Sequence, residues 1–129
     1  MNPPRLRIEP LGAAKPDGEQ WRTTWRVANL EPDPVRIVGV VAPHSQFRGE
    51  TAIDREIRGK GSTQVSLVVR VAGATASEIE NAFVILTIEQ GDQRWRALAR
   101  LRIALEDQGT PRLRVETVTM QRVGFSGEL

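Results

Sequence analysis

Polar and apolar residues alternate with a period of two through most of this chain. Leu6 and Ile8 share one face of the segment 6–11, while Arg7 and Glu9 share the other. Successive side chains of a β-strand point to opposite sides, so this pattern indicates strands, and no stretch of a dozen residues has the spacing of an amphipathic helix. The alternation predicts strands over residues 6–11, 20–30, 35–42, 63–73, 81–90, 93–105 and 113–120.

The segments between these strands are rich in residues that form turns. EPDP at 31–34 combines prolines, which fix φ, with acidic side chains that bond their own backbone, and GAAKPDGE at 12–19 is a polar loop. Residues 43–61 are the least regular, and we expect a long connection there with one or two short edge strands. About seven strands without a helix predict an all-β fold, an immunoglobulin-like antiparallel β-sandwich, as a single domain over residues 1–129.

Gly91-Asp92 predicts a two-residue hairpin, because glycine accepts the positive φ that begins a type II′ turn. The register then follows by counting. One face pairs Ile88 with Trp95, Leu86 with Ala97, Val84 with Ala99 and Ala82 with Leu101, and it belongs to the core because it carries no charge. The other face pairs Glu89 with Arg94, Thr87 with Arg96, Ile85 with Leu98 and Phe83 with Arg100.

This second face leaves apolar side chains directed away from the core. Ile85 and Leu98 are the clearest, and the strand over 35–42 carries further apolar residues of matching parity. An apolar patch with a polar rim often marks a contact surface, although a loop or terminus folding over it would explain the same pattern. The predicted patch is Val38, Val40, Phe83, Ile85 and Leu98, rimmed by Arg36, Arg96, Arg100 and Arg102.

The three tryptophans are predicted to fill the core. Trp21 and Trp25 share parity with Val27, and Trp95 shares parity with Ala97 and the other apolar residues of its strand. A ligand platform would instead place aromatic rings among polar residues on an open face. Trp21, near the end of its strand, is expected to be the most exposed of the three.

Composition narrows the classes of function that the chain can have. It has 129 residues and a formal net charge of +2. Because it contains no cysteine, disulfides, thiolate metal sites and thiol nucleophiles are excluded. The N-terminus lacks the continuous apolar segment of a secretory signal, and no apolar run reaches the roughly 20 residues of a membrane span. We therefore expect a cytoplasmic protein without a membrane partner.

Candidate catalytic and metal-binding residues are few. His44 is followed by Ser45, but neighbours on an extended strand point to opposite sides, so they do not form a nucleophile and base. RGKGST at 58–63 lacks the glycine spacing of a phosphate-binding loop. Asp54 and Glu56 alternate with arginines as in a solvated charged loop. We predict no catalytic residue, no cofactor and no metal, and hence no enzyme.

Nucleic acid is the main alternative partner. The predicted outer face of the strand 93–105 carries Arg94, Arg96, Arg100 and Arg102 in a line about 27 Å long at roughly 3.4 Å per residue. Arg22 and Arg26 could extend this line on a neighbouring sheet, and such a line could follow phosphates. Glu89 on the same face and the small net charge argue against it, and a solvated arginine face explains it equally well.

The run from Trp21 to Ile37, in which the alternation ends at Asn29 and turns through prolines into a second strand, resembles bacterial immunoglobulin-like domains of the cell-adhesion-related type. TQVSLVVRV looks like a later strand of these domains. The resemblance concerns the fold and implies no site residue.

The function expected from the sequence is a non-enzymatic protein–protein interaction or accessory module that associates with a protein partner or with itself, as a homodimer, through the outer sheet face. The alternatives are an arginine-lined binder of nucleic acid or another polyanion, and a binder of a small molecule between the sheets.

Overall fold

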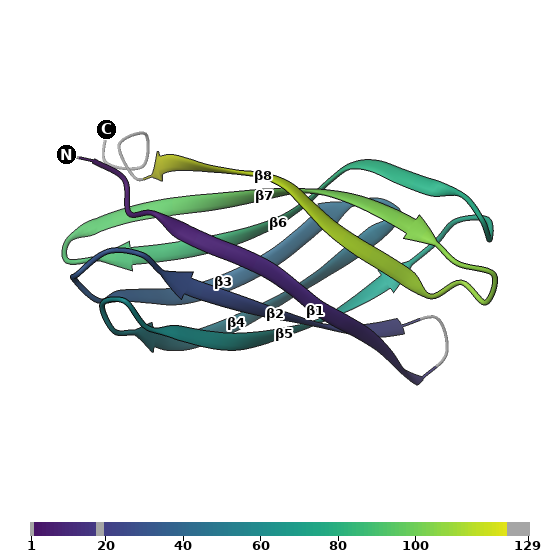
Figure 1. Cartoon of the computed structure of the whole chain (residues 1–129), viewed down its shortest axis with the longest axis horizontal. Helices are drawn as coiled ribbons and strands as arrows, with labels where there is room; N and C mark the ends of the chain where they lie inside the picture. Colours follow the sequence, from purple (N-terminus) through teal and green to yellow (C-terminus); the bar gives the residue numbers. More distant parts are fainter. Residues whose placement is uncertain (1, 18–19, 124–129) are drawn as a thin grey trace.

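The computed structural model describes residues 2–17 and 20–123, which form β-strands joined by short turns (Figure 1). Neighbouring strands are antiparallel throughout, so the all-β prediction is confirmed. No helix in these residues is long and apolar enough to cross a membrane. The strands within the described ranges are β1 Leu6–Asp17, β2 Gln20–Asn29, β3 Val35–His44, β4 Phe47–Ile57, β5 Ser62–Val71, β6 Glu78–Gln90, β7 Gln93–Leu105 and β8 Pro111–Val123.

The strands form one sheet in the order β1-β2-β5-β4-β3-β6-β7-β8, which curls into a nearly closed barrel. Its two end strands, β1 and β8, lie alongside each other, but no backbone ladder joins them in the described residues (Figure 1). The predicted immunoglobulin-like sandwich of about seven strands is wrong, because all eight described strands belong to a single sheet. The difference arises from β4, which links the two halves that a sandwich would keep apart.

Strand β4 occupies a region that the sequence pattern assigned to a connection. His44 ends β3, Ser45 and Gln46 form a tight turn, and β4 pairs with β3 from His44↔Phe47 to Val35↔Ile57. Its inward positions include Gly49 and Thr51, opposite the buried Ala42 and Val40, where other strands carry larger apolar residues. The hydrophobic alternation of β4 is therefore weak, although the strand is long and lies within the sheet.

The joint between β4 and β5 is narrow. The ladder between them has two pairs, Phe47↔Val71 and Arg48↔Arg70. The backbones come so close beside it that a Cβ at Gly49 would lie 2.2 Å from the Val68 carbonyl oxygen. Beyond this point a side chain replaces the ladder, because Arg55 Nη1 donates to Thr63 Oγ1 and to the Gln64 carbonyl oxygen, each at 3.0 Å.

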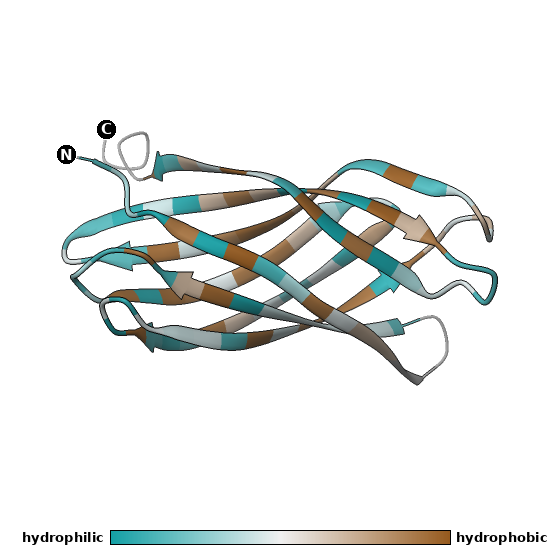
Figure 2. Ribbon diagram, in the orientation of Figure 1, coloured by the Kyte–Doolittle hydropathy of each residue, from teal (hydrophilic) through white to brown (hydrophobic). Residues whose placement is uncertain are grey.

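Apolar side chains from every strand fill the barrel, and Figure 2 shows the brown and teal residues alternating along the strands. Trp21, Trp25 and Trp95 are 8%, 1% and 5% exposed, so the prediction that they lie in the core is confirmed; Trp21 has the largest exposed fraction of the three, but it is buried as well. Trp25 Nε1 donates to Thr23 Oγ1, and this hydroxyl donates to the Leu67 carbonyl oxygen, both at 2.8 Å. The polar groups buried on β2 are thereby satisfied.

The β6–β7 hairpin has the predicted register at all eight pairs, from Glu89↔Arg94 to Ala82↔Leu101. Gly91 has a φ of +59°, the positive value that the turn requires. The ion pair predicted between Glu89 and Arg94 is also present. The two-residue turn therefore determines which side chains of both strands face the core.

A buried amide holds one end of the barrel together. Asn29, at the end of β2, is 1% exposed, and its Nδ2 donates to the Asp33 carbonyl oxygen at 2.8 Å and to the Ile57 carbonyl oxygen at 3.2 Å. Its Oδ1 accepts the Glu31 N–H at 3.0 Å. Asn29 thus connects the turn after β2 to the end of β4, and it gives the EPDP turn a fixed position.

Candidate functional site

Three apolar side chains lie in a row on the outer surface of β3, β6 and β7. Val41 pairs with Ile85, and Ile85 pairs with Leu98, so the row crosses three hydrogen-bonded strands. Each of the three is half-buried. Phe83, also half-buried, lies two residues from Ile85 on the same face of β6, opposite Arg100. We call Val41, Phe83, Ile85 and Leu98 the outer apolar row.

The predicted membership of Val40 in this patch is wrong. Val40 is 2% exposed and pairs with the core residue Leu86, so its side chain points into the barrel. A β-bulge between Ile37 and Gly39 gives β3 one extra residue relative to β6, and the parity of the later β3 residues is reversed. Val38 lies in the bulge and is half-buried, and Val41 takes the outer position instead. Gly39 was the available signal, because a glycine inside a strand often marks a bulge.

The arginines that border the outer apolar row are held largely by acidic neighbours. Arg94 pairs with Glu89, and Arg100 donates to Asn81 Oδ1 and lies 3.9 Å from Glu116 Oε1. Arg102 Nη1 is 3.4 Å from carboxylate oxygens of both Glu78 and Glu80. Among the described residues, Arg96 alone of these four has no such partner. The line of charge predicted on β7 is therefore largely neutralised within the protein itself.

Two arginines near the outer apolar row have a raised pKa because of their acidic partners. The hydrogen bond to Glu116 and the charge of that carboxylate, reinforced by Glu80 and Glu78, raise the pKa of Arg102. Arg36, another predicted rim residue, donates to Asp54 Oδ1 at 2.6 Å, and this contact raises its pKa. These side chains are exposed, so we attribute to them an effect on the surface potential rather than on stability.

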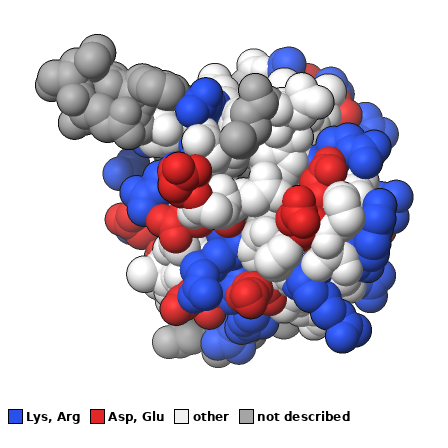
Figure 3. All heavy atoms as spheres, turned by 90° about the vertical axis from the view of Figure 1, so that its left-hand side faces the viewer, with Lys and Arg blue, Asp and Glu red and all other residues white. Residues whose placement is uncertain are grey.

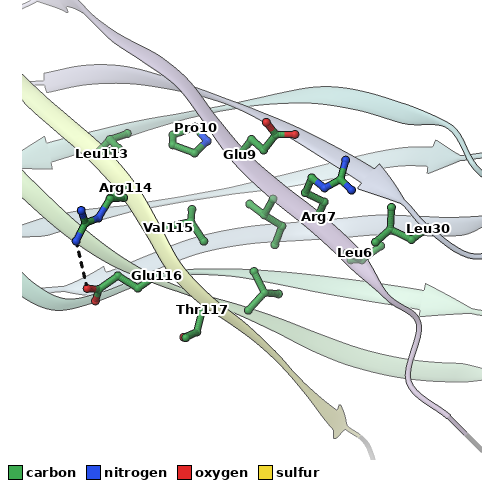
Figure 4. A pocket seen from close by; sticks show the side chains of 12 residues that line it. Leu6, Arg7, Glu9, Pro10, Leu30, Leu113, Arg114, Val115, Glu116 and Thr117 are labelled. Carbon is green, nitrogen blue, oxygen red and sulfur yellow. Dashed lines mark ion pairs between the residues drawn. The ribbon is translucent and has the colours of Figure 1, made fainter.

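A groove of about 530 Å³ runs along the seam between β1 and β8 (Figure 4). The buried side chains of Leu6 and Ile8 line it from one strand, and Arg114 and Glu116 contribute an ion pair of 3.9 Å from the other. The remaining lining residues are Arg7, Glu9, Pro10, Leu30, Leu113, Val115, Thr117 and Val118.

Proline helps to keep this seam open. The Leu30 N–H donates to the Arg5 carbonyl oxygen, so alternate residues of β1 from Arg5 onward bond to β2. The backbone groups of Leu6, Ile8 and Pro10 then face β8, and Pro10 has no N–H to offer there. Proline is typical of such strand edges because it prevents pairing.

The groups considered for catalysis have structural partners. His44 Nδ1 accepts the Gln46 N–H at 3.0 Å across the β3–β4 turn, which is an ordinary structural hydrogen bond. Lys60, in the RGKGST segment at 58–63, donates through Nζ to the Leu30 carbonyl oxygen at 2.7 Å. Within the described part of the chain, no three histidine, cysteine or acidic side chains gather as metal ligands would.

Charged side chains are distributed unevenly over the surface. Figure 3 views the end of the barrel at which β6 and β7 are joined, and basic and acidic side chains are mixed over the middle of this end. Basic side chains gather along the right-hand margin of the same view. The outer faces of the barrel therefore differ in charge.

Comparisons with known proteins give no match, whether to a family model, to a curated protein or to a solved structure. The resemblance of residues 21–37 to bacterial immunoglobulin-like domains therefore stays a prediction.

Proposed function

We propose that the chain is a cytoplasmic, non-enzymatic interaction module that associates with a second copy of itself through the outer face of β3, β6 and β7. The observation that carries this proposal is the outer apolar row, in which Val41, Ile85 and Leu98 are adjacent on three paired strands. These strands also direct apolar side chains into the barrel. A sheet that faces water on one side usually has polar residues there, so the row favours a buried outer face.

The charged border of the row supports the same proposal. Arg94, Arg100 and Arg102 already have acidic or amide partners, so an approaching surface meets a nearly neutral rim. Interfaces of moderate size combine an apolar centre with a polar rim of this kind. Arg96, which has no ion pair among the described residues, could donate to carbonyl or carboxylate groups of the second copy.

Light scattering coupled to gel filtration tests the proposal on wild type and on Leu98→Arg, over a wide range of concentrations. We expect wild type to elute as a dimer and Leu98→Arg as a monomer, because an arginine in the middle of the row would be desolvated without a partner. Ser66→Arg is the matched control: it adds the same side chain at an exposed position of β5, away from the row, and should leave the dimer intact.

A wild-type protein that remains monomeric at the highest concentration would overturn the self-association proposal. A dimer that survives Leu98→Arg but is lost in Ser66→Arg would place the interface on the opposite side of the barrel. Circular dichroism of both variants confirms that each is folded before the masses are compared.

A further inference from the structure

The outer face of β2 and β5 carries donors of hydrogen bonds and no acidic side chain. Arg22 and Arg26 point outward from β2, and register places them opposite Val68 and Gln64 of β5. Farther along, Arg70 lies between Gln20 and Arg48, which are its partners on the two sides. The outward positions of the two strands are Gln20, Arg22, Thr24, Arg26 and Ala28 on β2, and Ser62, Gln64, Ser66, Val68 and Arg70 on β5.

Neighbouring strands extend this surface, which we call the basic face. Arg7 of β1 and Arg48 of β4 add two exposed arginines to it. The described acids nearest to it lie on the two flanking strands: Glu9 and Asp17 on β1, opposite Arg26 and Gln20 in the register, and Glu50 on β4. The basic face comprises Arg7, Arg22, Arg26, Arg48 and Arg70 together with the neutral polar residues of β2 and β5.

Three arginines of the basic face are available to a partner. Arg22, Arg26 and Arg48 are exposed and have no ion pair or side-chain hydrogen bond to any other described residue. Glu9 is opposite Arg26 in the register, yet the two form no ion pair. This contrasts with β7, where three of four arginines are held by acids or an amide. Arginines without internal partners keep their full capacity for an external anion.

We infer that the basic face binds the phosphate backbone of double-stranded nucleic acid without reading its sequence. Guanidinium groups bind phosphates through two parallel hydrogen bonds, and serine, threonine and glutamine side chains also donate to phosphate oxygens. Arg22 and Arg26 are separated by about 14 Å along β2, at roughly 3.4 Å per residue. A duplex carries about eight phosphates on its two strands over that length of its axis, at roughly 1.7 Å per charge, so the two arginines can contact different phosphates.

The composition of the face favours a duplex over other anionic partners. None of the outward residues of β2 and β5 is aromatic, so the face has no platform on which unpaired bases could stack. The exposed large apolar side chains of the described residues are Leu11 on β1, at 41%, and Val68 on β5, at 38%, and β2 lies between these two strands. A surface that inserts into a membrane needs a continuous apolar face, which these two residues do not supply.

Fluorescence anisotropy with two labelled duplexes of unrelated sequence tests the inference. With Arg7, Arg22, Arg26 and Arg48 neutralising phosphates, we expect a slope of log K against log salt of about −3.6, and hence about a 150-fold loss of affinity between 50 and 200 mM salt. Arg22→Gln/Arg26→Gln should reduce the magnitude of the slope by about 2 and weaken binding to both duplexes alike. Arg94→Gln/Arg96→Gln is the matched control, because it removes the same charge from β7 and should leave binding nearly unchanged.

Several results would overturn the inference. These are no binding of wild type at low salt, an equal loss in both double variants, or a loss confined to the β7 variant. Vesicles of anionic phospholipid provide a further arm: binding to them without binding to the duplexes would assign the face to a membrane surface. The dimer tested with Leu98→Arg is measured separately, so the failure of one proposal does not decide the other.

Discussion

Two outer faces of this barrel are built from the same kind of strand and differ in what their side chains do for one another. On β3, β6 and β7, arginines alternate with acids across neighbouring strands, and half-buried apolar side chains lie between them. On β2 and β5, arginines alternate with serine, threonine and glutamine, and these side chains are mostly exposed. Counting arginines cannot separate the two faces; what separates them is where the carboxylates lie.

The comparison explains how a chain with a net charge of +2 has a strongly basic surface. Glu78, Glu80, Glu89 and Glu116 all face the arginines of β7. The β2–β5 side retains its positive charge because none of the described outward positions of these two strands carries an acid. A small net charge therefore gives a poor description of the local potential that a partner meets.

The largest expected effect is on the stability of the fold, and it distinguishes the inward Val40 of β3 from the outward Val41. Val40→Asp should destabilise the protein by about 4 kcal/mol or more, because it buries an unpaired carboxylate in the core, whereas Val41→Asp on the outer row should cost about 1 kcal/mol or less. Urea unfolding monitored by tryptophan fluorescence measures both. Equal costs, or a higher cost at Val41, would contradict the bulge at Gly39 and restore Val40 to the outer face.

A second variant tests the basic face by strengthening it. Val68 is opposite Arg22 and is 38% exposed, so Val68→Arg adds a cation with no core packing to lose. One further phosphate contact should raise the affinity for a duplex about eightfold at roughly 0.1 M salt and steepen the salt slope by about 0.9. Val68→Gln controls for the longer side chain, and Thr119→Arg on β8 controls for the added charge. An equal gain from Thr119→Arg would show that the affinity follows net charge alone.

A third variant makes the two faces more similar in charge by removing carboxylates from the β7 side. Glu89→Gln/Glu116→Gln removes the carboxylates beside Arg94 and Arg100 and one of the three beside Arg102, which keeps Glu78 and Glu80. We expect β7 to gain weak duplex binding, seen as a few-fold increase in apparent affinity at low salt, because Arg94 and Arg100 would then have no carboxylate partner and could pair with phosphates. Adding Arg94→Gln should reverse part of the gain. No change in binding would mean that the carboxylates do not cause the difference between the faces.

The sequence predicts local relationships in this fold better than distant ones. The hairpin through Gly91 has the predicted register because a two-residue turn leaves no freedom in the pairing, and the tryptophans follow from parity alone. Parity fails at the bulge between Ile37 and Gly39, where one extra residue moves Val40 inward. The sequence predicts no more than one or two short edge strands where β4 lies, because Gly49 and Thr51 weaken the alternation.

Closure of the sheet also depends on contacts that no local pattern records. The choice between two sheets and one curled sheet depends on the short β4–β5 joint, which brings together Phe47 and Val71 from distant parts of the sequence. The same joint sets Arg48 beside Arg70. The sequence predicts that Arg22 and Arg26 face outward. It does not predict the extent of the basic face, because that extent depends on the order of the strands in the sheet.

The smallest expected effect lies at the edge of the basic face, where pairing of charges begins. Arg5 donates to Glu31 Oε2 through its side chain at 2.8 Å and through its backbone N–H at 3.1 Å, and these bonds hold the pKa of Glu31 below its ordinary value of 4.5. A carboxylate with a lowered pKa in the folded state stabilises the fold above its ordinary pKa, and this contribution is lost as the pH falls through the folded value.

Glu31→Gln should therefore lower Tm at about pH 7 by no more than a few degrees, because Arg5 is 70% exposed and the pair is screened by solvent. At about pH 3 the difference from wild type should shrink, since both proteins then lack much of the charge. Calorimetry at the two pH values measures it, and Arg5→Gln should have a smaller effect in the Glu31→Gln background than in wild type. A difference that grows on acidification would mean that folding raises the pKa of Glu31 instead of lowering it, and that the contact with Arg5 does not stabilise the carboxylate.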